Sequence, residues 1–148
     1  MMSFKTGLIL HRQKTSTMKI LPIDKIREAD AYTIEHEPIE DIDLMERAAG
    51  KLFKWIRKRV EVSQRFFIFA GLGNNGGDGL ALARMLGKAG YEVFVYVVRY
   101  SEKYSDSFTE NYQRYLEMSP DTLFDLENED DFPETGEDDL IEIGRAHV

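Results

Sequence analysis

The sequence predicts an α/β fold built on a parallel sheet, and one stretch carries most of that prediction. Residues 66–70 (Phe-Phe-Ile-Phe-Ala) form an apolar run bounded by a charged residue and a glycine, the pattern of a strand buried on both faces. A glycine-rich segment follows at 71–79, then a helical run to residue 89 and a second apolar strand at 93–98. Strand, glycine loop, helix and strand make a βαβ unit with parallel strands. Ligands of such sheets bind beyond the carboxyl ends of the strands, where the glycine segment falls.

The segment 71–79 reads Gly-Leu-Gly-Asn-Asn-Gly-Gly-Asp-Gly and is the strongest candidate for a binding site. So many glycines argue against helix or strand, and we expect a tight turn whose backbone a ligand can approach closely. The helix that follows directs its free amide groups and its positive dipole end at the same ligand. Asn74 and Asn75 supply amide oxygens and donors suited to a hard cation or a polar ligand, and Asp78 adds a carboxylate. A role for Asp78 as a helix cap alone stays open.

Gly71, Gly73 and Gly76 also satisfy the G-x-G-x-x-G spacing of dinucleotide-binding loops, which is a weak signal by itself. An ordinary NAD-binding fold has an acid at the end of the second strand for the ribose, whereas Arg99 occupies that place here. An arginine there could meet a 2′-phosphate, but exposed strand ends often carry arginine. An ordinary NADP-dependent oxidoreductase therefore ranks third among the functional hypotheses, after the two that are given below.

Helices are expected before this unit. One begins near Asp24, a suitable N-cap, and ends at Glu37 before Pro38. Its shared face comprises Ile26, Ala29, Thr33 and Ile34. The next is expected to open at Asp43, with Glu46 three residues later as a capping-box partner. Its buried stripe is expected to comprise Met45, Ala48, Ala49, Leu52, Ile56 and Val60.

After the central unit, a helix is expected over 106–118 and a short strand over 122–125. Asn111 lies off the apolar face of that helix, so it is either a solvated residue or a site residue. The acidic run 127–139 is typical of a solvated loop.

Composition narrows the class of protein. A length of 148 residues with 43% hydrophobic residues predicts one globular domain. The absence of cysteine excludes a disulfide frame and a thiolate site. A net charge of −8 disfavours nucleic acid and anionic membranes as partners. No apolar run approaches the length of a bilayer span, and we expect a cytoplasmic protein.

The two ends of the sequence carry separate expectations. Residues 1–18 are expected to be non-native or disordered, and the domain is expected to cover 19–141. Within them, residues 1–17 are the expected upstream extension and Met18 is the expected natural start. Residues 142–148 read Glu-Ile-Gly-Arg-Ala-His-Val, which a common sequencing-adapter string would encode. We therefore expect an artefactual tail there and assign no role to Arg145 or His147.

Three segments together resemble the NAD(P)H-hydrate epimerase family, also called the YjeF N-terminal domain. They are Asp30 with Thr33-Ile34, the run Leu-Met-Glu-Arg-Ala-Ala at 44–49, and the run from Gly71 to Arg84 with its Gly-Asn-Asn-Gly-Gly-Asp-Gly core. The long glycine motif is far more specific than the bare glycine spacing. The similarity extends over roughly residues 19–141.

The resemblance implies a Rossmann-like three-layer αβα sandwich with a parallel sheet, incomplete at the C-terminus. It implies an isomerase that interconverts the R and S forms of NADHX and NADPHX, which are hydrated nicotinamide nucleotides, and so repairs them. The implied substrate-binding residues are Asn74, Asn75, Gly76, Gly77 and Asp78, and Asn75 is also the implied ligand of a potassium ion. A homodimer and a dehydratase, fused or separate, are the implied partners.

The sequence departs from the family after the strand expected at Asp139. The family has Asp-Ala-x-Phe-Gly-x-Gly there, which supplies the proposed acid–base carboxylate and a second potassium ligand, and this segment is not present. The catalytic residue therefore stays unassigned, and Glu142 is not given the role. We expect the front half of an epimerase, inactive by itself. The alternative is a non-catalytic binding or scaffold module with the same fold.

Overall fold

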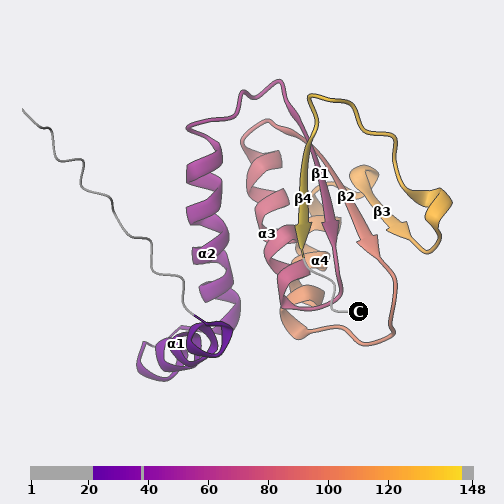
Figure 1. Ribbon diagram of the computed structural model, residues 1–148. Coiled ribbons are helices and arrows are strands. Elements are labelled where there is room, and N and C mark those ends of the chain that lie inside the picture. Colours follow the sequence, from indigo (N-terminus) through magenta and orange to yellow (C-terminus); the bar gives the residue numbers. More distant parts are fainter. Residues whose placement is uncertain (1–21, 38, 145–148) are drawn as a thin grey trace, which may run out of the picture.

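A four-stranded parallel sheet in the order β3-β2-β1-β4 forms the centre of the molecule (Figure 1). The strands are β1 (Arg65–Ala70), β2 (Glu92–Val98), β3 (Leu123–Leu126) and β4 (Leu140–Gly144). Their apolar, β-branched and aromatic residues favour extended chain, and β1 lies between β2 and β4, so it is buried over nearly its whole length. The structure is a computed structural model that describes residues 22–37 and 39–144. The predicted extension at 1–18 lies outside these residues, as do Arg145 and His147.

The helices are α1 (Ile23–His36), α2 (Asp41–Ile56), α3 (Asn74–Lys88) and α4 (Asp106–Met118). Helix α3 packs on β1, β2 and β4 and lies between α2 and α4 (Figure 1). One core joins these three helices to a single face of the sheet, where alternate strand residues such as Ile68 and Val95 are fully buried. The predicted α/β class and parallel sheet are confirmed.

The opposite face of the sheet carries aromatic side chains in place of a helix. Phe67, Phe69, Phe94 and Tyr96 lie there, and Phe132 stacks on Phe69 with ring centroids 5.6 Å apart. The long connection from β3 to β4 supplies Phe132, and its regular structure is a single 3-10 turn, Glu129–Asp131. The second helical layer of the expected sandwich is therefore not found among residues 22–37 and 39–144.

The start of α3 differs from the prediction. The glycine-rich segment was expected to be a turn up to residue 79, but the helix already begins at Asn74. Gly76, Gly77 and Gly79 are helical, because close packing against neighbouring elements outweighs their poor helix propensity. The predicted stop at Gly90 is confirmed by its left-handed backbone, with φ of 91°.

The flanking helices correct two further expectations. Helix α2 begins at Asp41, and Glu46 does not cap it but contacts arginines of α3 and α4. The expected apolar face of α1 is not buried, and no residue of α1 is buried within the described part of the chain. In the stripe predicted for α2, Ala48 and Leu52 are exposed, whereas Met45, Ala49 and Ile56 are buried as expected.

Strand β4 continues past the boundary predicted at residue 141. Its pairing with β1 runs from Phe66 opposite Leu140 to Ala70 opposite Gly144. Backbone hydrogen bonds to β1 hold the strand irrespective of the broken apolar pattern. Across the described ranges, no helix combines the length and apolar character that crossing a membrane requires.

Candidate functional site

The connection Gly71–Gly73, which leads from β1 into α3, is the centre of the candidate site. It is held from two sides. The amide of Gly71 donates to the carbonyl of Gly144 at the end of β4 (3.2 Å), and the carbonyl of Leu72 accepts from the amide of Ser105 before α4 (3.0 Å). The first amides of a helix have no carbonyl one turn earlier, so α3 directs donors and its positive dipole end at this junction.

A cavity of about 760 Å³ opens at this junction. Gly73 lines it from the connection, Asn74, Asn75 and Asp78 line it from α3, and Tyr100 lines it after β2. The other lining residues belong to α1 and α2, namely Ile23, Ile26, Arg27, Asp30, Asp41, Leu44, Met45, Arg47, Ala48 and Lys51. The structure thus brings the three predicted polar residues of the glycine segment into one cavity.

The predicted site residues Gly76 and Gly77 lie elsewhere, packed against protein. A Cβ at Gly76 would overlap the backbone carbonyl of Gly71. A Cβ at Gly77 would lie 3.0 Å from the Met45 sulfur and 3.2 Å from the backbone nitrogen of Phe108. These glycines let α3 approach the end of β1, α2 and α4, which positions the polar residues between and beside them.

Asp78 is the most perturbed carboxyl group that faces the cavity. Burial, together with the nearby charges of Asp41 and Asp30, raises its pKa from 3.8 to about 6. Asp41 is itself oriented, because it accepts a hydrogen bond from the hydroxyl of Ser107 on α4 (2.8 Å). A carboxyl group with such a pKa can take up or release a proton near neutral pH.

Glu142 of β4 lies on the other side of the same region. Its Oε2 is buried without a hydrogen-bond partner and lies near Gly79 of α3. Burial, and then the charge of Asp78, raises the pKa of Glu142 to about 7. Two mutually repelling carboxyl groups therefore lie at this end of the sheet, and ionising one disfavours ionising the other.

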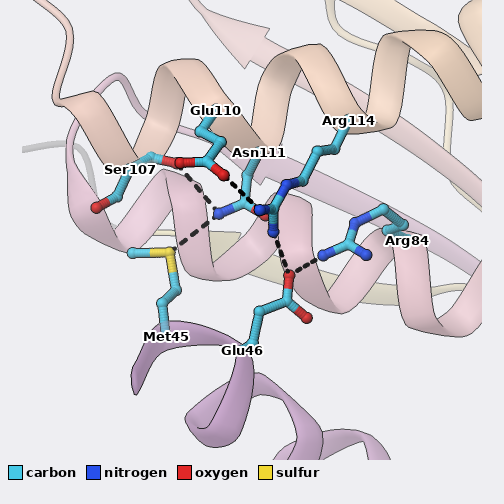
Figure 2. Close-up of polar contacts among 7 residues, drawn as sticks. All are labelled: Met45, Glu46, Arg84, Ser107, Glu110, Asn111 and Arg114. Carbon is cyan, nitrogen blue, oxygen red and sulfur yellow. Dashed lines mark hydrogen bonds and ion pairs between the residues drawn. The ribbon is translucent and has the colours of Figure 1, made fainter. Parts of the chain in front are cut away.

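A polar junction of three helices fixes α2 next to the site (Figure 2). The carboxylate of Glu46 on α2 accepts from Arg84 of α3 and from Arg114 of α4, the latter at 3.3 Å. Arg114 also pairs with Glu110 one turn earlier on α4. Arg84 has a side chain only 13% exposed, so losing Glu46 would leave a largely buried charge unpaired.

Asn111, which the sequence left open as a site residue, belongs to this junction and not to the cavity wall. It is fully buried, and its amide donates to the carbonyl of Ser107 (3.1 Å) and to the sulfur of Met45 (3.2 Å) (Figure 2). Met45 in turn packs on Gly77. Asn111 therefore contacts Met45, which is itself a residue of the cavity wall.

Arg99, at the end of β2, is already engaged. Its guanidinium donates to Asp125 (2.7 Å) and lies over the rings of Tyr104 and Tyr112. The next residue, Tyr100, lines the cavity, whereas Arg99 is not among the lining residues.

Sequence reasoning missed several residues of the site. Asp41 comes from α2, and its sequence signal was only a carboxylate near the start of a helix. Asp30 comes from α1, and its sequence signal was only its place in the family resemblance. Tyr100 follows Arg99 at the strand end and lines the cavity, but the sequence pattern drew attention only to Arg99.

The implied potassium ion would need oxygen donors at the cavity. Within the described residues, no group of three or more His, Cys, Asp or Glu side chains is placed to hold a metal ion. Asn75 is exposed at the cavity, and its amide oxygen and the Asp78 carboxylate are hard donors. Carbonyl-type oxygens are what potassium accepts in place of water, so these donors fit the ion.

Together the fold and the cavity define an α/β domain with a glycine-rich helix start at the carboxyl ends of a parallel sheet, the place where such sheets bind ligands. A family model described as "YjeF-related protein N-terminus" matches residues 41–141. The chain belongs to this family.

Two relatives agree with this assignment, and one solved structure shares the fold. An NAD(P)H-hydrate epimerase of Lentilactobacillus buchneri is 40% identical over 80 residues, which are 53% of this chain and 37% of the relative. A bifunctional NAD(P)H-hydrate repair enzyme Nnr of Thermofilum pendens is 30% identical over 99 residues, 67% of this chain and 19% of that protein. The crystal structure of yeast ynu0, YNL200c, superposes with a TM-score of 0.60 at 24% identity, over 74% of this chain and 48% of the yeast chain. The chain spans less than half the length of each of these proteins.

Proposed function

We propose that this chain is the front half of an NAD(P)H-hydrate epimerase and supplies the surface that binds hydrated NADH or NADPH. The observation that carries the proposal is the gathering of Asn74, Asn75 and Asp78 in one cavity at the start of α3. The names of the curated relatives support the same substrate and the same isomerase reaction.

The chemistry of the cavity suits a hydrated nicotinamide ring. The amides of Asn74 and Asn75 can both donate and accept hydrogen bonds, which matches a carboxamide and a ring hydroxyl. Asp78, with a pKa of about 6, can donate or accept a hydrogen bond to the ring near neutral pH, and the catalytic group of the reaction is left unassigned. Asn75 is the residue that would hold potassium, which supplies a fixed positive charge for the oxygen atoms of the ligand.

One observation weakens the oxidoreductase hypothesis. Arg99 would have to receive a 2′-phosphate, but Asp125 and two tyrosine rings already occupy its guanidinium. The scaffold hypothesis makes a different prediction from the epimerase hypothesis. It predicts that even a longer form of the protein binds a ligand or a partner without converting R to S.

Partners and location form the outer part of the proposal. The bifunctional relative supports a dehydratase that acts with this protein, fused or separate. We further propose a homodimer in the cytoplasm.

The test is titration of the purified chain with NADHX, combined with chromatography that follows R-to-S conversion. We expect binding that Asp78→Asn weakens and that Glu61→Gln, in the segment before β1 at the amino ends of the strands, leaves unchanged. The proposal would be overturned if the folded chain without substitutions failed to bind NADHX. Turnover by the chain itself would show that its catalytic group lies within the 148 residues.

A further inference from the structure

Three basic side chains share the wall of the cavity that α1 and α2 provide. They are Arg27 of α1 and Arg47 and Lys51 of α2. Arg47 and Lys51 are four residues apart on one helix, so they lie on the same face one turn from each other. None of the contacts proposed above between the nicotinamide ring and Asn74, Asn75 and Asp78 involves these three basic side chains.

These side chains are available for a ligand. Arg27 and Lys51 make no hydrogen bond or ion pair within residues 22–37 and 39–144. Arg47 pairs with Glu37 at 3.0 Å, but both side chains are about half exposed, at 47% and 53%. An exposed pair of this kind contributes little and can be exchanged for another anion.

The polar junction keeps the basic side chains in place. Met45 and Glu46 are held toward α3 and α4 by Asn111 and by the two arginines (Figure 2). These contacts fix the rotation of α2 about its axis. Arg47 and Lys51 consequently keep their places in the cavity wall and do not sample the whole surface around the helix.

Charge is separated along α2. Asp41, at its first turn, faces the carboxyl group of Asp78, whereas Lys51 lies ten residues further, roughly 15 Å along the axis. An acidic end beside the asparagines and a basic end farther along match a ligand with a neutral polar ring at one end and an anionic group beyond it.

We propose that Arg27, Arg47 and Lys51 form the site for the diphosphate group of a dinucleotide ligand. This inference rests on the proposed function, because it places the diphosphate of the same substrate whose ring lies at Asn74, Asn75 and Asp78. Arginine and lysine are the side chains that hold phosphate oxygens, through forked or point-charge contacts.

The experiment separates the two ends of the ligand. Reduced nicotinamide riboside probes the ring end without phosphate, and ADP-ribose probes the diphosphate without the ring. In the double variant Arg47→Gln/Lys51→Gln we expect ADP-ribose to bind about tenfold more weakly and with a smaller dependence on salt, since two charge-assisted contacts are lost. Binding of reduced nicotinamide riboside is expected to change less than about twofold, as no contact to the ring is removed.

Lys54→Gln/Lys58→Gln is the matched control. It removes the same charge beside the same helix, but both lysines lie outside the cavity wall. Thermal unfolding of both variants shows whether the fold is kept. Equal ADP-ribose affinity in the two double variants overturns the inference, and NADHX binding that persists in both then leaves the proposed function standing. Tight ADP-ribose binding that needs Arg47 and Lys51, in a chain that does not bind NADHX, would uphold the inference and reject the function. A chain that binds none of the probes rejects both.

Discussion

The first turns of α3 have two sides that carry residues of one motif and serve different purposes. Gly76, Gly77 and Gly79 face β1, α2, α4 and β4, where even one added carbon atom meets protein. Asn74, Asn75 and Asp78 face the cavity. The glycine spacing therefore reflects how closely the helix packs, and the ligand chemistry resides in the polar residues. Substitutions on the packed side should cost stability, and substitutions on the cavity side should change binding and pH dependence.

The largest effect is expected for Gly76→Ala. Its new methyl group would overlap the carbonyl of Gly71, and backbone cannot move aside as a side chain can. We expect a loss of about 3 kcal/mol or more in the free energy of unfolding, measured by urea denaturation. Gly77→Ala meets the flexible end of Met45 at 3.0 Å, so a smaller loss of about 1–2 kcal/mol is expected.

Gly50→Ala is the control for this pair. It lies in α2, and a Cβ there meets nothing within 4 Å. Replacing a helical glycine by alanine is expected to stabilise by about 0.5–1 kcal/mol. Equal effects at Gly76 and Gly50 would show that the glycines of α3 do not serve packing.

Glu46→Gln should be next in size. It removes the charge that Arg84 and Arg114 share, and it leaves the largely buried Arg84 without a carboxylate. We expect a loss of about 2–3 kcal/mol, below the range for fully buried pairs because Glu46 is partly exposed. Glu110→Gln breaks an exposed pair on α4 and is expected to cost less than about 1 kcal/mol. If the two variants lose the same stability, the junction does not hold α2.

The local sequence pattern predicted the helices and strands better than it predicted which contacts their residues make. The strand at 66–70, the helix at 106–118 and the stop at Gly90 depend on short-range chemistry, and the structure confirms them. The helical state of Gly76 and Gly77 was not predicted, because it depends on the close packing of α3 against Gly71 and Met45, which the helix propensity of glycine does not encode.

The candidate site divides in the same way. Asn74, Asn75 and Asp78 were found because the motif presents them together in the sequence. Asp41 and Asp30 affect the site only through the packing of α1 and α2, which no local pattern encodes. Glu46 shows the opposite error, since a plausible local cap was replaced by tertiary ion pairs.

Asp78→Asn should change how stability depends on pH. The folded state raises the pKa of Asp78 from 3.8 to about 6, so between these values the folded chain holds the proton more tightly than the unfolded chain. The resulting stabilisation is complete below 3.8 and is lost as pH rises through 6. The variant should therefore be the more stable protein at pH 7, by about 1–2 kcal/mol after allowing for partial solvent exposure, and should lack this slope.

Urea denaturation at pH 4 and pH 7 measures the effect. The difference between variant and parent should grow with pH, because only the parent carries an ionised carboxylate at Asp78. Removing that charge should also lower the pKa of Glu142, which Asp78 raises. A difference that does not vary with pH would mean that Asp78 is solvated as an ordinary surface acid.

The smallest effect on stability is expected for Asn75→Ala, and it is the sharpest test of the cavity side. The side chain is exposed, so in the absence of potassium the free energy of unfolding should change by less than about 0.5 kcal/mol. A ligand that binds only the folded state raises stability by RT ln(1 + [L]/Kd), so potassium should raise the Tm of the parent when it replaces choline at equal ionic strength. Asn75→Ala should abolish most of that rise, and Asn74→Ala should retain it, since Asn75 and not Asn74 is assigned to the ion. A potassium-dependent rise that survives in Asn75→Ala would remove this residue from the ion site while leaving its contact with the ring to be judged by NADHX binding.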